Sequence, residues 1–215
     1  MLRHEIIEEL RQLTLFENID LEILEQISHS FIRRLYNRND IIYSTHTEAH
    51  HFIFVLKGKL KISRLSELGK EHIIRIVGPK EFTGELALFE GMRKSQAVAL
   101  VPTEIYVIEH QVFRNLLETY PSLALKMIEV LALRLHLSEE QSVWLSTSTA
   151  KDRLLIYLNK EAKIVGDKRI VYHQETKRFI AGYLGMSTET LSRVLTQLEQ
   201  EGKILDHQNH FIEIL

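Results

Sequence analysis

Residues 175–202 read ETKRFIAGYLGMSTETLSRVLTQLEQEG and carry the most informative pattern of the chain. Gly185 follows an apolar helical run and tolerates the positive φ that ends a helix, and Ser187 is suited to cap the next helix. Two helices joined by such a turn predict a helix-turn-helix, whose second helix can enter a major groove. One shared core is expected from the apolar positions Phe179, Ile180, Leu184, Leu191, Val194, Leu195 and Leu198.

The second helix of this pair carries its polar residues opposite its apolar stripe. Arg193 can donate two hydrogen bonds to a guanine edge, Glu189 can accept one from cytosine, and Ser192 is a short, adaptable contact. Lys177, Arg178 and Arg193 make the stretch locally basic in a chain of net charge −2. The predicted contacts to double-stranded DNA are Thr176, Lys177, Arg178, Ser187, Thr188, Glu189, Thr190, Ser192 and Arg193.

An ordinary helical hairpin with a charged outer face would share much of this pattern. Two short strands, at residues 203–206 and 210–215, follow Gly202 and are joined by a polar turn at residues 207–210. The helix-turn-helix and the two strands together form a winged helix. This combination favours a DNA-binding domain over an ordinary helical hairpin. The rest of the last third, after a small-residue hinge at residues 146–149, is expected to be mostly helical.

The pattern changes upstream to short strands. Residues 1–30 have helical apolar spacing, and the chain from residue 31 to residue 108 has runs of strand type separated by turn signals such as Lys57-Gly58 and Gly78-Pro79. Only residues 82–89 interrupt this strand-type pattern. An antiparallel sandwich or barrel is therefore expected, with strands at residues 40–43, 52–56, 59–63, 72–77 and 104–108.

A single long helix is predicted from Pro121 to Thr147, because proline suits a first helical turn and no glycine or further proline follows until Gly166. One apolar stripe has the alternating spacing of a coiled-coil seam, which we interpret as a dimer interface. A second stripe contains Val130, Leu133, Leu137 and Trp144, and one wide core-facing stripe is the alternative. The seam consists of Ile128, Leu131, Leu135, Ser138, Ser142 and Leu145.

In this order of elements the chain resembles the Crp/Fnr family of bacterial transcription regulators over essentially its whole length. Residues 52–60 resemble the family's strand–turn signature, and residues 84–89, GELALF, resemble its cyclic-nucleotide cassette. Residues 187–193, STETLSR, are similar to the recognition helix of the Fnr branch, which reads half-sites of TTGA type. The resemblance implies a homodimer that binds a palindrome and contacts RNA polymerase.

The cassette departs from the family pattern where the cyclic phosphate would bind. Cyclic-AMP binders of the family carry an Arg-Ser pair there, and this chain has Ser95 and Gln96, so the charge-assisted clamp is lost. Arg93 or Lys94 could replace it only after a shift of the loop. Either an effector binds here or a Glu85–Arg134 ion pair closes a vestigial pocket. The expected pocket residues are Gly84, Glu85, Leu86, Ser95, Gln96, Arg134 and Ser138.

Composition excludes several other classes. The 215 residues include no cysteine, so a cysteine-held iron–sulfur cluster, a disulfide and a thiol nucleophile are excluded. No stretch reaches the length of a membrane span, no signal peptide is recognisable, and a cytoplasmic protein is expected. The histidines His46, His50 and His51 lack a fixed metal geometry, and neither His72 nor His110 stands out as a haem ligand. We expect no metal, no cofactor and no enzymatic activity.

The prediction is thus an α+β protein: a cyclic-nucleotide-binding-like β-roll at residues 1–120, a long dimerisation helix at residues 121–147 and a winged helix-turn-helix at residues 148–215. Its expected function is that of a homodimeric, sequence-specific DNA-binding regulator that does not depend on cyclic AMP. The alternative is a sensor module for a cyclic nucleotide or another small molecule without a direct DNA function.

Overall fold

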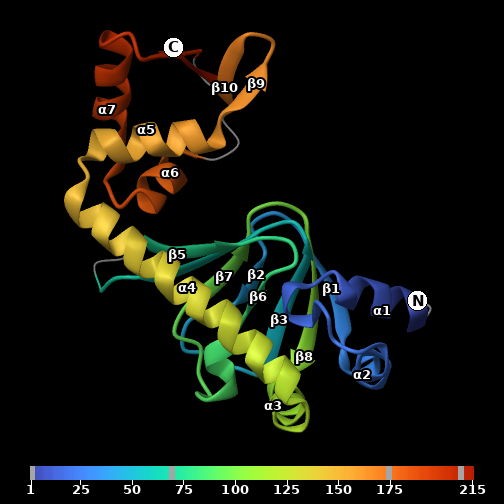
Figure 1. Ribbon diagram of the computed structural model, residues 1–215. Helices are drawn as coiled ribbons and strands as arrows, with labels where there is room; N and C mark the ends of the chain where they lie inside the picture. Colours follow the sequence, from blue (N-terminus) through green and yellow to red (C-terminus); the bar gives the residue numbers. More distant parts are fainter. Residues whose placement is uncertain (1–2, 68–70, 173–175, 208–210) are drawn as a thin grey trace. The chain divides into compact units, whose positions relative to one another are not determined.

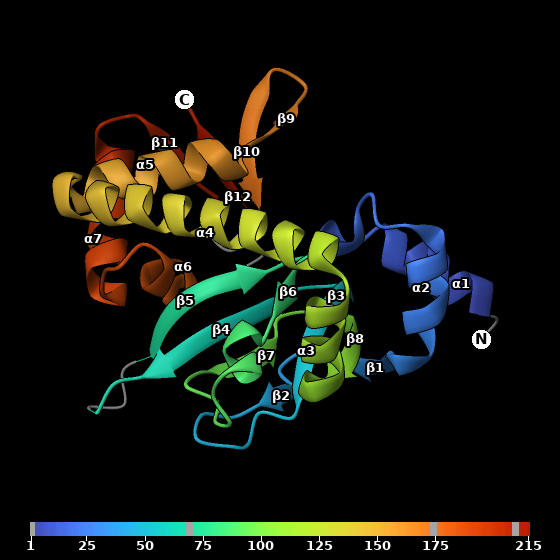
Figure 2. The ribbon, with the colours of Figure 1, turned by 60° about the horizontal axis from the view of Figure 1, so that its bottom comes forward.

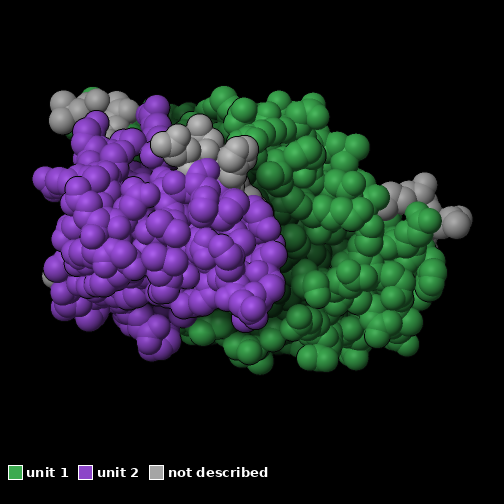
Figure 3. Space-filling view, turned by 90° about the horizontal axis from the view of Figure 1, so that it is seen from above, with its two compact units in different colours: residues 1–135 green, residues 136–215 purple. Residues whose placement is uncertain are grey.

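The computed structural model describes residues 3–67, 71–172, 176–207 and 211–215. The chain divides into two compact units, residues 1–135 and 136–215 (Figures 1 and 3). The boundary falls inside the long helix α4 (Pro121–Thr147), whose bounds agree with the predicted helix. The division of the chain into three functional parts stays a prediction.

The first unit opens with short helices that cover one side of the roll. These are α1 (Arg3–Arg11), η1 (Thr14–Phe16), α2 (Leu21–Ile27) and η2 (Ser28–Ser30). Their apolar residues recur at helical spacing, and Leu10, Phe16 and Leu24 are fully buried against the sheet.

Eight strands form two four-stranded antiparallel sheets, so the predicted sandwich is confirmed (Figure 2). One sheet has the order β1-β8-β3-β6 and the other β2-β7-β4-β5. The break in texture at residues 82–89 corresponds to β6 and the single turn η3 (Glu85–Leu88). The strands are β1 (Ile32–Tyr36), β2 (Ile41–Tyr43), β3 (His51–Lys57), β4 (Leu60–Leu65), β5 (Glu71–Val77), β6 (Phe82–Thr83), β7 (Gln96–Ala99) and β8 (Thr103–Glu109).

Strand β3 separates two cores because successive side chains of a strand point to opposite faces. Phe52 and Phe54 pack with the helices and with Phe113, and the rings of Phe52 and Phe113 stack at 4.2 Å. Ile53 and Val55 point the other way, into the interior of the roll. Because both faces are covered, all four side chains are buried, which explains the continuous apolar run in the sequence.

Helices α3 (His110–Thr119) and α4 follow the last strand of the roll, and α3 lies beside β3 and β8 (Figure 2). The first half of α4 packs on the same aromatic core through the buried side chains of Leu123 and Met127. Val130 and Leu131 add partly buried contacts.

The second unit contains α5 (Ala150–Glu161), α6 (Lys177–Tyr183), α7 (Thr188–Gln200) and a four-stranded sheet of order β11-β12-β10-β9. The predicted strands after Gly202 are β11 (Ile204–Asp206) and β12 (Phe211–Ile214), whereas residues 208–210 of the predicted turn lie outside the described residues. All three helices and the sheet share one core that includes Leu154, Leu158, Leu184, Leu191, Leu198 and Ile212.

The part after the hinge contains three helices, as expected, and also one hairpin that was not predicted from the sequence. Strands β9 (Lys163–Val165) and β10 (Lys168–Tyr172) pair with Val165 opposite Lys168, so Gly166 and Asp167 form a two-residue turn. Gly166 has φ +61°, which a hairpin turn of this length requires and glycine supplies at little cost. The Gly-Asp pair was the available signal for this hairpin.

Candidate functional site

Helices α6 and α7 form the predicted helix-turn-helix, and each is capped by the residue that precedes it. The hydroxyl of Thr176 accepts a hydrogen bond from the backbone N–H of Phe179 at 3.2 Å. Ser187 Oγ accepts one from the backbone N–H of Thr190 at 3.1 Å, so the predicted cap of α7 is confirmed. Between the helices Gly185 has φ +62°. Both helices therefore begin at a residue whose hydroxyl caps them, and the turn between them contains a glycine that tolerates its positive φ.

Helix α7 has one buried face and one exposed face. Leu191, Val194, Leu195 and Leu198 are buried in the core of the unit. Glu189, Ser192 and Arg193 are exposed on the opposite side. The packed leucines hold the helix in one rotation, which holds this polar ridge in a constant orientation.

The other predicted DNA contacts differ in their exposure. Thr176, Lys177 and Arg178 are exposed at the start of α6. Thr188 is half-buried, and the hydroxyls of Ser187 and Thr190 lie 3.1 Å apart within the cap. Three of the predicted DNA contacts, Glu189, Ser192 and Arg193, thus lie on one exposed ridge, whereas Ser187 caps the helix.

The wing that follows α7 is anchored by a buried carboxylate. Glu213 on β12 is 7% exposed and accepts a hydrogen bond from Lys168 Nζ at 3.0 Å. His207 Nε2 lies 3.4 Å from the same carboxylate. The hydrogen bond from Lys168 lowers the pKa of Glu213 and keeps the group ionised. These contacts tie the hairpin β9–β10 to the predicted wing.

In the roll, the cassette residues line a cavity of about 160 Å³. Gly84 has φ +96°, and a Cβ on it would lie 2.9 Å from Arg93 Nη1 and 3.2 Å from the His51 carbonyl oxygen. The turn therefore admits only glycine at this position without a shift of its neighbours. The predicted residues that line the cavity are Gly84, Glu85, Leu86 and Ser95.

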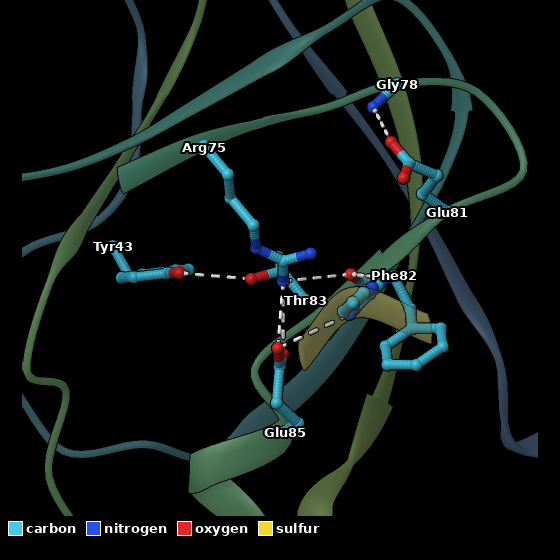
Figure 4. Close-up of polar contacts among 8 residues, drawn as sticks. Tyr43, Arg75, Gly78, Glu81, Phe82, Thr83 and Glu85 are labelled. Carbon is cyan, nitrogen blue, oxygen red and sulfur yellow. Dashed lines mark hydrogen bonds and ion pairs between the residues drawn. The ribbon is translucent and has the colours of Figure 1, made fainter. Parts of the chain in front are cut away.

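Glu85, which lines this cavity, accepts hydrogen bonds from two arginines, of which Figure 4 labels Arg75. Arg75 Nη2 donates to Glu85 Oε1 at 2.9 Å and to the Phe82 carbonyl oxygen at 3.2 Å. Arg134 Nη1 donates to Glu85 Oε1 at 3.3 Å, and its Nη2 donates to the same Phe82 carbonyl at 3.0 Å. Burial and the neighbouring charge of Arg75 lower the pKa of Arg134 to about 10. We name Arg75, Glu85 and Arg134 the cassette triad.

Arg75 was not among the site residues predicted from the sequence. It stands in the apolar run HIIRIV at residues 72–77, where one arginine among strand residues was the available signal. Its side chain points from β5 towards Glu85 (Figure 4). The same view shows Tyr43 beside Thr83, with their hydroxyl oxygens 3.5 Å apart.

The residues at the clamp position make other contacts. Gln96 Nε2 donates to Ser63 Oγ at 3.1 Å, and Lys94 Nζ lies 2.7 Å from a carboxylate oxygen of Glu90. The Arg93 guanidinium lies 4.2 Å above the Tyr43 ring and donates to the His51 carbonyl oxygen. Burial lowers the pKa of Arg93.

The residues of the dimer seam predicted on α4 differ in how far their side chains are exposed. Ile128 and Leu135 are 61% and 62% exposed, whereas Leu131 is partly buried against the roll. Ser138 and Ser142 are exposed in the second unit, and the side chain of Leu145 lies outside the described part.

The second stripe predicted on α4 is not one continuous packing face. Val130 packs on the roll core and Trp144 on the core of the second unit. Leu133 and Leu137 are more than half exposed. Leu123 and Met127, which precede this stripe, supply the fully buried contacts at the start of the helix.

Within residues 3–67, 71–172, 176–207 and 211–215, no three side chains of His, Cys, Asp or Glu gather as a metal ion requires. No helix in the described part combines the length and the apolar character of a bilayer span.

Two family models match the chain. The cyclic nucleotide-binding domain matches residues 33–120, and the Crp-like helix-turn-helix domain matches residues 153–215. The cyclic AMP receptor protein of Thermus thermophilus is 30% identical over 192 residues, which cover 88% of this chain and 87% of that protein. A probable transcriptional regulator, flp, of Lacticaseibacillus casei is 27% identical over 94% of this chain and 91% of its own length.

Solved structures agree with these matches. The catabolite activator protein of Thermus thermophilus has a TM-score of 0.55 at 28% identity, over 94% of this chain and 93% of that one. The c-di-GMP-responsive regulator CLP of Xanthomonas campestris has a TM-score of 0.80 at 19% identity, over 91% of this chain and all of the other, and so supports the fold alone. With both domains matched and a relative at 30% identity over most of its length, the chain belongs to the Crp/Fnr family of DNA-binding transcription regulators.

Proposed function

We propose that two copies of the chain bind a palindrome of TTGA-type half-sites, each through one α7, and regulate transcription without cyclic AMP. The observation that carries this proposal is the exposed ridge of Glu189, Ser192 and Arg193 opposite a fully packed leucine face. Arginine can bond the O6 and N7 atoms of guanine, and glutamate can accept from the N4 amino group of cytosine. A ridge of this chemistry on a rigid helix reads base edges in the major groove.

Dimerisation through α4 is supported by its exposed apolar side chains. Leu125, Ile128 and Leu135 are 66%, 61% and 62% exposed. Their spacing places them on one side of the helix, away from the contacts of Leu123 and Met127 with the roll. Exposed leucines in this number on one helix are typical of a subunit interface. Palindromic DNA requires a symmetric pair of recognition helices, which such a dimer supplies.

Independence from cyclic AMP is supported by the cavity itself. The residues at the clamp position, Ser95 and Gln96, carry no charge for the cyclic phosphate. Glu85, which the family uses for the ribose, already accepts hydrogen bonds from Arg75 and Arg134. The clamp position and Glu85 therefore do not offer cyclic AMP the contacts that the family uses. We favour the closed cassette over an effector-filled one.

A sensor module without a DNA function is the competing reading. It would not need the capped turn before α7 or the sheet that follows it, whereas a regulator needs both. RNA polymerase is the further partner that we propose for a regulator of this type.

The test is binding of the purified chain to a fluorescent duplex with two TTGA-type half-sites, at two salt concentrations, with and without cyclic AMP. We expect selective binding over a scrambled duplex, loss of affinity with added salt, and no change with cyclic AMP. Equal affinity for both duplexes would refute the proposed reading, and a strong gain with cyclic AMP would refute only the independence from that ligand.

A further inference from the structure

The roll contains a second cavity, of about 410 Å³, apart from the cassette cavity. Strands β1, β2 and β3 and the loop of residues 44–50 line it. Its polar lining includes Arg34, Tyr36, Tyr43, Thr47, His51 and Arg93. Tyr43 and Arg93 also line the cassette cavity, so these two side chains are a wall that the cavities share.

The backbone holds this lining in place. Arg34 lies opposite Ile105 in the antiparallel register, and Ile105 is buried inside the roll, so the Arg34 side chain starts from the inner face of β1. The loop is bonded to the segment that carries Arg93. His46 N donates to the Arg93 carbonyl at 2.8 Å, and Arg93 N donates to the Thr47 carbonyl at 2.8 Å.

The two arginines lack a close counter-ion, although the charge of Glu85 acts on Arg93 without a direct ion pair. Arg93 is 8% exposed, and its Nε is buried without a hydrogen-bond partner in the described part of the chain. Within the same part, no carboxylate lies within 4.0 Å of a charged nitrogen of either Arg34 or Arg93. The lining carboxylate of Glu48 lies 3.0 Å from His50 Nε2. A buried guanidinium without a counter-ion is costly unless an anion binds to it.

His51 reports the electrostatic potential of this cavity. Burial lowers its pKa most, and the charges of Arg34, His50 and Arg93 lower it further, whereas Glu109 opposes them. The potential at the imidazole is therefore positive, as an anion site requires.

We propose that this cavity binds a small oxyanion, a carboxylate or a phosphate, between Arg34 and Arg93. Arginine suits such a ligand because its planar fork matches the geometry of both groups. The Thr47 and Tyr36 hydroxyls add donors to the lining. The site is separate from the cassette cavity, and because Arg93 and Tyr43 line both, an anion here changes the wall of the cassette.

The experiment is calorimetric titration of the full chain with inorganic phosphate and, separately, with succinate, at low ionic strength. We expect at least one of the two anions to bind with a dissociation constant in the millimolar range or tighter. Arg34→Gln removes a lining charge at an exposed side chain and is expected to weaken that binding about tenfold or more. Arg34→Lys keeps the charge and is expected to lose less.

The matched control is Arg64→Gln, because Arg64 is also exposed and lines the cassette cavity but not the second cavity. We expect the affinity of this variant to stay within twofold of the parent. Loss of binding in Arg64→Gln with none in Arg34→Gln would move the anion to the cassette and overturn the proposal. Failure of both anions to bind would also overturn it, and which of them binds distinguishes phosphate from carboxylate chemistry.

Discussion

Arg134 on α4 donates from Nη1 to Glu85 Oε1 at 3.3 Å, so the helix proposed to dimerise is bonded directly to the cassette. Arg134 also lies 4.0 Å above the Phe82 ring, which fixes its side chain from a second direction. Glu85 and α4 are therefore linked directly through the Arg134 side chain. Two arginines of the chain, Arg75 and Arg134, thus donate to the same carboxylate.

The contacts of the cassette triad predict that removing the carboxylate of Glu85 lowers the free energy of unfolding. Glu85→Gln leaves Arg75 and Arg134 adjacent without a counter-charge, and we expect the free energy of unfolding to fall by about 1–3 kcal/mol. Chemical denaturation of the purified variant measures this. The control is Glu90→Gln, whose pair with Lys94 is exposed and is expected to change stability by less than about 1 kcal/mol. Equal stabilities for the two variants would remove the triad's structural role.

The geometry of the turn at Gly58 predicts that adding a single methyl group there lowers the stability of the roll. Gly58 has φ +89°, and a Cβ would lie 2.4 Å from Thr103 Oγ1 and 2.6 Å from the Pro102 carbonyl oxygen. We expect Gly58→Ala to destabilise the roll by more than about 1 kcal/mol, through both strain and overlap. Gly91→Ala is the matched control, because a Cβ there meets nothing within 4 Å. Thermal unfolding of both variants measures the difference in stability. A Gly58→Ala variant as stable as Gly91→Ala would contradict the turn geometry.

The recognition ridge predicts a loss of discrimination. Arg193→Ala should cost about 1–3 kcal/mol at one guanine of each half-site and leave weak, non-specific binding in place. Fluorescence anisotropy on duplexes that differ only at that base pair measures the change. Gln200→Ala, at the exposed end of the same helix, is expected to keep the parent's preference. If Arg193→Ala keeps it as well, the assignment of that residue is wrong.

The exposed face of α4 predicts where a charge disrupts assembly. Leu135→Glu places a carboxylate in the proposed interface, and we expect sedimentation velocity to detect mainly the monomer. Leu133→Glu is the control, since Leu133 is equally exposed but two residues away on the helix, and so on nearly the opposite side. A dimer that survives Leu135→Glu would place the interface elsewhere.

Glu201 predicts acid sensitivity of the second unit. The hydrogen bond from Lys151, with others from Gln197 and Lys203, lowers the pKa of Glu201 from 4.5 to about 2. The folded state thus binds fewer protons than the unfolded state between these values, and its stability falls as the pH drops from 4.5 towards 2. The unfolding temperature should therefore fall more steeply in the parent than in Glu201→Gln over this range. Parallel pH profiles would show that the contacts do not stabilise the fold.

Much of the second unit could be predicted because its signals are local. Ser187, Gly185 and the leucines of α7 act through their own helix and turn, so spacing alone identified them. The hairpin β9–β10 escaped because its strands are short and its outer side chains, such as Ile164 at 82% exposure, do not show a buried face. The Gly166–Asp167 turn carried the only strong local signal there.

The amino-acid sequence by itself determined the order of most elements, the winged helix and the cassette, because each depends on residues close together in the chain. Only the tertiary structure decided that Arg75 meets Glu85 and that Arg34 and Arg93 line one cavity. Arg75 and Glu85 lie on separate elements ten residues apart, and Arg34 and Arg93 are far apart in the sequence. Strand pairing brings them together, and the register of a pairing depends on contacts that no local pattern records.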